Sequence, residues 1–313
     1  MYSIAIIIPA FNEAANLKDN LAEILEHIRK IEHVNFKIIV VDDGSTDDTA
    51  TVALSRSQND PDVRLLSLSR HFGKEAAIHA GLSCVKKFDA AIVMDSDLQH
   101  PPTLIADMVI KWRESYAVVE AIKASRAGES VSRGLLVKAY YRIFNFFTKL
   151  TISGDTDFKL LDASVIHAYL ELPEHNRFFR GLIKWMNFSS AQIAFDVPES
   201  IREKSTWSTP SLFRYAISSI TSFTAYPLQI VTILGGLTFL FSLLIGIKAL
   251  ADKLSGNAVD GFTTVILLIL LIGSVLMFSV GLIGIYIGKI HDEVKRRPNY
   301  LINREISNLD DYP

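Results

Sequence analysis

The sequence predicts an α/β protein with a mostly parallel sheet, followed by two membrane-spanning helices. Short β-rich runs alternate with helical stretches between residues 4 and 125, and two long charge-free apolar runs follow residue 226. Strands that alternate with helices form right-handed βαβ units, with helices on both faces of the sheet. Hydrophobic residues make up 49% of the 313 positions and charged residues 21%, a balance that also favours a membrane part.

Five strands are expected in the first part of the chain, and four of them lead into polar segments. The β-rich runs are Ile4–Ile8, Lys37–Val41, Val63–Leu68, Ala90–Met94 and Ala117–Ala124. Ligands of parallel sheets bind beyond the carboxyl ends of the strands. The candidate site is therefore formed by the segments after the first four runs: Pro9–Glu13, Asp42–Asp47, Ser69–Lys74 and Asp95–His100.

The segment after the fourth run has the composition of a metal site. Asp95 and Asp97 alternate there, and Gln99 follows two residues later, so on an extended chain all three side chains could point one way. Hard oxygen ligands at this spacing suit Mg²⁺ or Mn²⁺, which complete their coordination with water and substrate phosphates. A solvated turn would have the same residues and is the alternative.

Two further segments contain candidate ligand contacts. Asp42 ends the second run and can contact a ligand, whereas Asp43 belongs to a turn that begins the next helix. Arg70 and Lys74 precede a helix that begins near Glu75, where a cation and backbone N–H groups can meet a phosphate. A solvated surface position is the alternative for each of these two cations.

The two apolar runs, Pro227–Ile247 and Gly261–Gly288, each exceed the roughly 20 residues that a helix needs to cross the hydrocarbon of a bilayer. Between them lie two Lys and two Asp, whereas basic residues gather after the second run, which places both ends of the hairpin in the cytoplasm. The N-terminus carries no basic n-region of a secretory signal. We therefore expect a cytoplasmic domain over residues 1–226, transmembrane helices at about 227–250 and 261–288, and a basic cytoplasmic tail over 289–313.

Two segments of the cytoplasmic domain have amphipathic patterns. On residues 133–150 one helical face is apolar and another is basic, and residues 210–225 repeat this pattern more weakly. Both are expected to lie at the membrane interface, and packing of their apolar stripes on the domain core is the alternative.

Net charge and cysteine content exclude several classes of function. The net charge of −2, from 32 basic and 34 acidic residues, gives no electrostatic reason to expect nucleic acid as a partner. The single cysteine, Cys84, excludes an intrachain disulfide and a cysteine-based zinc site, and suits a reducing compartment.

Four motifs follow the predicted strands in order: Pro9-Ala10-Phe11-Asn12-Glu13, Val41-Asp42-Asp43-Gly44-Ser45, Phe72-Gly73-Lys74 and Met94-Asp95-Ser96-Asp97-Leu98-Gln99-His100-Pro101-Pro102. Together they resemble the motifs of family 2 glycosyltransferases, which have the GT-A fold, a Rossmann-like, mostly parallel sheet. The Asp-Leu-Gln-His-Pro-Pro sequence and the C-terminal hairpin are similar to polyprenyl-phosphate glycosyltransferases. Among these, the chain resembles the dolichol-phosphate mannosyltransferase-like enzymes and, more closely, bacterial bactoprenol glucosyltransferases. The resemblance covers nearly the whole chain.

This resemblance implies roles for individual residues. The nucleotide-sugar would be bound by Pro9, Ala10, Phe11, Glu13, Asp42, Lys74 and Asp95. The metal ion on the donor diphosphate would be held by Asp95, Asp97 and Gln99, and Asp97 is also counted as catalytic. Arg126, in a Ser-Arg pair after the fifth run, would lie near the transferred phosphates, while Arg177, Arg180 and Gly181 match a segment beneath the membrane.

The chain departs from the family pattern at two places. Asp157 replaces a glycine of relatives at a position that faces the reaction centre, where a carboxylate can orient the acceptor or act as a base; an ordinary strand-start aspartate is the alternative. Relatives also carry a Gly-x-Ser-Lys-Trp segment near the acceptor, and this chain has lost its glycine and lysine. Contacts with the acceptor phosphate are expected from Arg126, Arg202, Lys204 and Ser205.

The implied reaction is a metal-dependent, inverting transfer of a sugar, with UDP-glucose as the expected donor, to undecaprenyl or another polyprenyl phosphate. It would take place on the cytoplasmic face of a bacterial inner membrane, with both termini in the cytoplasm. A polysaccharide synthase of the same family and a non-catalytic nucleotide-sugar-binding scaffold are the alternatives. A homo-oligomer is expected, because glycines of the apolar runs offer surfaces for close helix packing.

Overall fold

The computed structural model describes residues 1–123, 155–175, 177–195, 226–255 and 261–303, with the single residues 142, 145, 146, 221 and 224. The chain divides into two compact units, Met1–Thr209 with Arg297–Pro313, and Pro210–Arg296. The amphipathic segments predicted at 133–150 and 210–225 lie outside the described residues, apart from those single positions.

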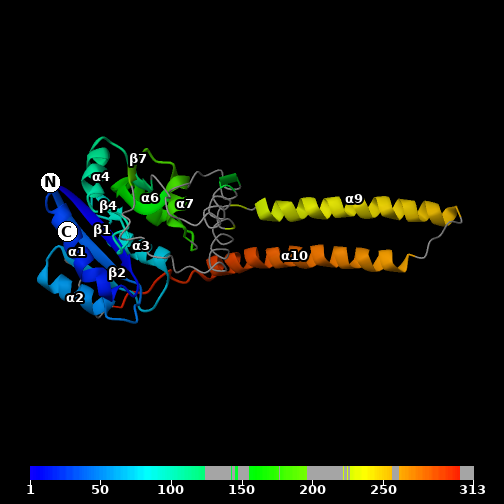
Figure 1. Cartoon of the computed structure of the whole chain (residues 1–313), viewed down its shortest axis with the longest axis horizontal. Helices are drawn as coiled ribbons and strands as arrows, with labels where there is room; N and C mark the ends of the chain where they lie inside the picture. Colours follow the sequence, from blue (N-terminus) through cyan, green and yellow to red (C-terminus); the bar gives the residue numbers. More distant parts are fainter. Residues whose placement is uncertain are drawn as a thin grey trace. The chain divides into compact units, whose positions relative to one another are not determined.

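A mixed sheet forms the centre of the first unit (Figure 1). Its described strands are β1 (Tyr2–Ala10), β2 (Val34–Asp42), β3 (Val63–Ser67), β4 (Ala90–Val93), β5 (Val118–Lys123), β6 (Asp155–Asp162) and β7 (Ser190–Phe195). They lie in the order β3-β2-β1-β4-β6-β5-β7. All pairings are parallel except those of β6, which runs antiparallel to both β4 and β5. The prediction of a mostly parallel sheet with five strands at these places is confirmed.

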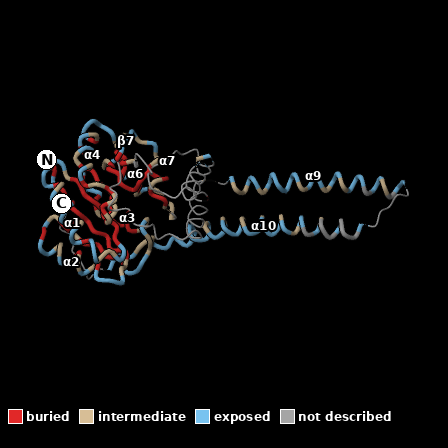
Figure 2. The backbone as a smooth tube through the Cα atoms, in the orientation of Figure 1, coloured by how far each residue is buried: buried red, intermediate tan, exposed pale blue. Residues whose placement is uncertain are grey.

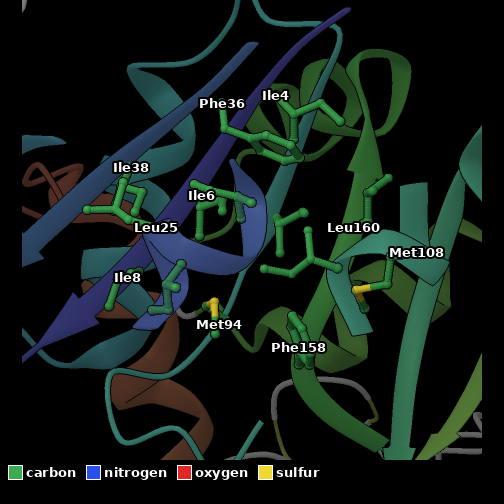
Figure 3. Close-up of a cluster of buried hydrophobic side chains, with 14 of the residues drawn as sticks. Ile4, Ile6, Ile8, Leu25, Phe36, Ile38, Met94, Met108, Phe158 and Leu160 are labelled. Atoms are coloured by element: carbon green, nitrogen blue, oxygen red, sulfur yellow. The ribbon is translucent and has the colours of Figure 1, made fainter. Parts of the chain in front are cut away.

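Helices cover both faces of this sheet. The described helices of the first unit are α1 (Ala14–Ile28), α2 (Thr49–Asn59), α3 (Lys74–Ser83), α4 (Leu104–Arg113), α6 (Ala163–Glu171) and α7 (Phe179–Met186). The buried cluster beneath α1 and α4 takes Ile4, Ile6 and Ile8 from β1 (Figure 3). On the other face α3 approaches β1 so closely that a Cβ at Gly81 would lie 2.3 Å from the Ile7 side chain. The central strand is therefore apolar on both faces, as expected of a strand buried between two helical layers.

The second unit contains two long helices, α9 (Tyr226–Leu254) and α10 (Phe262–Lys295), which lie side by side (Figure 1). Both are long and apolar enough to cross a membrane, and neither is buried within the protein. Their described side chains are mostly exposed along the whole length of each helix, whereas the buried residues gather in the sheet of the first unit (Figure 2). Large apolar side chains exposed on all sides of a helix favour a lipid environment over water.

The chain after α10 rejoins the first unit. Ile302 forms an antiparallel bridge with Leu68, just beyond the end of β3. The sequence pattern predicts only a basic tail for this segment and no pairing with the sheet. Its described residues, up to Asn303, extend the sheet at the β3 edge.

Candidate active site

The carboxyl ends of three neighbouring strands carry the first group of predicted residues. Ala10 at the end of β1 is in register with Asp42 at the end of β2, and the Ala10 carbonyl accepts a hydrogen bond from the Asp43 N–H at 2.9 Å. On the other side of β1, the Met94 N–H donates to Ile7 at 3.1 Å, so Asp95 follows directly. The parallel register brings these three segments to one edge of the sheet.

Hydrogen bonds join the loops that follow β1 and β2. Asn12 adopts a positive φ of 57°, its N–H donates to the Ser45 hydroxyl at 3.0 Å, and its side-chain oxygen accepts from the Thr46 N–H at 2.9 Å. The Glu13 N–H donates to the Thr49 hydroxyl at 2.8 Å. These contacts hold the Pro9–Glu13 motif against the loop that follows β2.

Asp42 is buried and both of its carboxylate oxygens are held. One oxygen accepts the Ser45 N–H at 3.1 Å and the other accepts the Ser67 hydroxyl at 2.9 Å. Phe11 lies beside it on the same edge and is 39% exposed, stacked on the His71 ring at 4.0 Å between centroids. The aromatic surface offers a face on which a planar base can stack.

Asp43 has a role that the sequence analysis missed. Its carboxylate accepts the N–H groups of Phe72 and Gly73, each at 2.8 Å, and lies 2.9 Å from the His71 ring nitrogen. Burial raises the pKa of this carboxyl, although the hydrogen bonds and His71 oppose the shift. Asp43 therefore fixes the loop that ends at Gly73, the N-cap of α3. No local pattern marks this contact, since its partners lie 29 and 30 residues away.

The neighbouring Gly44 is required by this loop. It has a φ of +67°, and a Cβ at this position would lie 2.2 Å from the Arg70 backbone carbon. Only glycine fits such a close approach in the left-handed region without strain.

Lys74 joins two carboxylates, one in the segment after β4 and one on β6. Its ammonium lies 2.5 Å from Asp95 Oδ1 and 2.6 Å from Asp157 Oδ2. Burial disfavours the charge on Lys74, but the two carboxylates outweigh burial and raise its pKa. The structure thus brings Asp157 together with Lys74 and Asp95, two residues that were predicted to bind the nucleotide-sugar.

Arg180, the second residue of α7, makes a bidentate ion pair with Asp157. Its Nε donates to Oδ1 at 2.6 Å and its Nη2 to Oδ2 at 2.8 Å. Although burial favours the neutral carboxyl, Lys74 and Arg180 hold the pKa of Asp157 well below its usual range. Arg177 lies elsewhere, donating to the carbonyl oxygens of Tyr169 and Leu172 at the end of α6.

Glu75 is a second residue that the sequence analysis missed as a contact. Its carboxylate accepts the N–H of Phe179, at the start of α7, at 2.8 Å. Burial and the nearby Asp157 raise the pKa of Glu75 to about 7. Glu75 therefore joins the beginning of α3 directly to the beginning of α7, and the adjacent Lys74 reaches Arg180 of α7 only through Asp157 on β6. An acidic residue in the first turn of a helix is common, so only the fold reveals this partner.

The predicted metal ligands follow β4, and the chain turns there. Asp97 Oδ1 accepts the Gln99 N–H at 3.1 Å, and Leu98 has a positive φ of 53°, so the segment is not an extended strand exit. The oxygen donors of Asp95, Asp97 and Gln99 suit Mg²⁺ or Mn²⁺ chemically. Among the described residues no three His, Cys, Asp or Glu side chains form a complete metal site. A metal ion here would need donor phosphates as additional ligands, as this class of site does.

A buried ionic cluster lies behind Asp157. Lys159 on β6 is 0% exposed and pairs with Glu120 on β5 at 2.9 Å and with Asp155. Glu120 also pairs with Lys184 of α7. Since Arg180 lies one turn before Lys184, α7 is attached to β5 and β6 by two ion pairs on one helical face.

Four predicted phosphate contacts, Arg126, Arg202, Lys204 and Ser205, lie outside the described residues. Their predicted roles are therefore proposals.

The chain is similar in sequence to known glycosyltransferases. The family model of glycosyl transferase family 2 matches residues 5–169. An uncharacterized glycosyltransferase of Synechocystis sp. is 35% identical over 302 residues, which make up 96% of this chain and 94% of that protein. The bactoprenol glucosyl transferases of Shigella phages SfII and SfV are each 30% identical over 96% of this chain and over 97% and 98% of their own lengths. The chain belongs to glycosyl transferase family 2 and is a glycosyltransferase.

Proposed function

We propose that the protein transfers glucose from UDP-glucose to undecaprenyl phosphate, or to a closely related polyprenyl phosphate, with inversion at the anomeric carbon. The observation that carries this proposal is the full-length similarity to relatives named bactoprenol glucosyl transferases, which includes the apolar helices as well as the sheet. A lipid acceptor also accounts for the presence of candidate membrane-spanning helices in the same chain.

The donor binds at the ends of β1 and β2 in this proposal. Phe11 offers an aromatic face to the base, Asp42 accepts hydrogen bonds from the nucleoside, and Pro9, Ala10 and Glu13 line the same edge. Asp95, Asp97 and Gln99 hold Mg²⁺ or Mn²⁺. When bound, this ion neutralises charge on the donor diphosphate.

Lys74 and Arg180 supply the positive charge of the site in this proposal. One oxygen of the lipid phosphate forms a bond with the anomeric carbon while the bond from this carbon to the β-phosphate oxygen breaks, and the electron pair leaves with UDP. The two cations stabilise negative charge on the phosphates during this exchange. The acceptor phosphate is already anionic at pH 7, so no strong base is needed.

Asp157 then acts as an orienting group. Both of its oxygens are engaged by Lys74 and Arg180, and its pKa is low, so it is a weak proton acceptor. Of the two roles left open above, this arrangement favours orientation of the two cations over base catalysis.

The remaining proposals concern organisation. Residues 1–226 form the cytoplasmic catalytic domain, residues 133–150 and 210–225 lie at the interface, and 227–250 and 261–288 span a bacterial inner membrane, with the tail 289–313 in the cytoplasm. Arg126, Arg202, Lys204 and Ser205 contact the acceptor phosphate. The protein associates into a homo-oligomer through its membrane helices.

The decisive experiment measures UDP release by the detergent-purified full chain. Release is measured with UDP-glucose, other UDP-sugars and GDP-mannose, with and without undecaprenyl phosphate, and with Mg²⁺, Mn²⁺ or a chelator. We expect release only when UDP-glucose, the lipid and a divalent ion are present together. Release that ignores the lipid would contradict the proposed acceptor, and release from another donor would contradict glucose.

A further inference from the structure

The segment Tyr300–Asn303, here called the C-terminal strap, completes the edge of the sheet beside the proposed donor site. The Ser69 N–H donates to the Leu301 carbonyl at 2.8 Å, and the Asn303 N–H donates to the Ser67 carbonyl at 2.9 Å. These two bonds flank the bridge between Leu68 and Ile302, the pattern of an antiparallel pair in which Leu68 and Ile302 themselves are not hydrogen-bonded.

The strap contacts the point at which β3 supports Asp42. Asp42 and Ser67 are the last registered pair of β2 and β3, and the Ser67 hydroxyl donates to Asp42 Oδ2 at 2.9 Å. The Leu68 N–H donates to the Asp42 carbonyl at 2.9 Å. The end of an edge strand frays readily because only one side is paired. The strap forms hydrogen bonds with the otherwise unpaired side of this strand end, at Ser67 and Ser69, the two residues that flank Leu68.

The strap also contacts the helix that begins with Lys74. The Tyr300 ring meets the His79 ring edge-on, with 5.5 Å between centroids. Burial raises the pKa of this tyrosine, and the neighbouring Ser83 opposes the shift. His79 lies on α3, so the strap touches the end of β3, which supports Asp42, and the helix that begins with Lys74.

We infer that the C-terminal strap, anchored on α3 by Tyr300, is a positioning element for the donor nucleotide and acts through Ser67 on the Asp42 carboxylate. This inference rests on the proposed donor site. It assigns a role in donor binding to the far end of the chain, beyond the apolar helices. Loss of the strap is expected to weaken nucleotide binding while the chemistry at saturating donor stays unchanged.

The test compares two truncations of the full chain and one point variant. Removal of residues 298–313 deletes the strap, whereas removal of residues 304–313 retains it and is the matched control. Asn303→Pro removes the N–H that donates to Ser67 and leaves the rest of the chain in place. Asp42→Asn is included as a direct test of the proposed donor contact.

The affinity for UDP with Mg²⁺, and the KM and kcat with UDP-glucose and undecaprenyl phosphate, are measured for each variant. The 298–313 deletion is expected to weaken UDP binding about tenfold, a cost of roughly 1.4 kcal/mol, and Asn303→Pro somewhat less. The KM for the lipid and the kcat at saturating donor should stay unchanged, even where loss of the strap's backbone hydrogen bonds and of the Tyr300 contact lowers the thermal midpoint. A merely structural role would lower kcat and the thermal midpoint together.

Failure of the inference and failure of the proposed function give different results. If Asp42→Asn weakens UDP binding and the strap variants do not, the inference is overturned and the donor site stands. If Asp42→Asn leaves UDP binding unchanged, the proposed donor site is wrong. The inference is then overturned as well, because it requires Asp42 to bind the donor. Equal weakening by both truncations would also overturn it, because the strap would not be the cause.

Discussion

The two halves of the sheet carry their charges in different places. In the half formed by β3, β2, β1 and β4, the strand β1 is apolar and buried from Ile4 to Ala10. The site carboxylates of this half appear only at the strand ends, where Asp42 is held by Ser45 and Ser67. In β5 and β6, charged side chains are buried within the strands themselves, among them Glu120, Asp155 and Lys159.

Because of this difference, the two halves contribute to the site in different ways. The apolar half supports the strand ends, and the ionic half positions the charged groups. Apolar strands pack between helices, and at their ends a backbone N–H and a hydroxyl are enough to hold the Asp42 carboxylate. Buried charges must be paired, and removing one partner leaves the other uncompensated in a medium of low dielectric constant. The ionic half, through Asp157 and α7, sets the position of the cations Lys74 and Arg180. The following variants test whether the two halves depend on these different interactions.

The largest effect on stability is expected for Lys159→Met. Lys159 is fully buried between Glu120 and Asp155, so the variant leaves two buried carboxylates without their shared cation. The cost should be about 3–5 kcal/mol, seen as a lower thermal midpoint in detergent. Adding Glu120→Gln and Asp155→Asn should recover most of this loss. An unchanged midpoint for Lys159→Met would mean that the cluster is not a source of stability.

Asp157→Asn should mainly reduce turnover. The variant removes the charge that holds Lys74 and Arg180, so kcat should fall about 100-fold, measured as UDP release in the complete assay. Asp62→Asn is the matched control, because Asp62 pairs with Lys37 at 2.7 Å in the other half of the sheet. It should retain wild-type kcat. Similar losses in both variants, or a wild-type kcat for Asp157→Asn, would contradict the assigned role.

Glu75→Gln should change how stability depends on pH. The pKa of Glu75 is raised to about 7 in the folded protein, so the folded state binds more protons than the unfolded state between its usual value of 4.5 and about 7. The contribution of this group is therefore fully present below pH 4.5 and is lost as the pH rises to about 7. The variant lacks this loss.

Relative to Glu75→Gln, the wild-type thermal midpoint should fall by several degrees across this pH window. Glu23→Gln, on the exposed face of α1, is the control and should follow the wild type. Parallel curves for wild type and Glu75→Gln would show that Glu75 ionises alike in the folded and unfolded states.

The smallest effect is expected for Ile39→Val in the apolar half. Ile39 on β2 is 1% exposed, and loss of one buried methylene should cost about 1 kcal/mol with kcat unchanged. The midpoint and UDP release are measured as before. A several-fold loss of kcat would show that the apolar half does more than support the site.

Much of the fold could be predicted from local patterns. The runs that became β1 to β5 are short and rich in β-branched residues, and they alternate with helical stretches, so they indicate their secondary structure without distant partners. The apolar runs that became α9 and α10 are similarly self-evident, since length and lack of charge alone distinguish them.

The antiparallel placement of β6 and the contacts of the site could not be predicted in this way. β6 enters between β4 and β5, and this places Asp157 against Lys74, 83 residues earlier, and against Arg180 of α7. The partner of Glu75 lies 104 residues away. No periodicity in the sequence encodes such separations.

The α/β class, the two apolar helices and the acidic strand ends follow from the sequence alone, because periodicity, run length and the parallel-sheet rule depend on residues near one another. The folded chain was needed to show that Asp157 binds two cations, that Asp43 holds the loop before α3, and that the C-terminal strap pairs with the end of β3. The physical reason is that hydrogen bonds and ion pairs act over a few ångströms in space, so their partners are known only once the chain has folded.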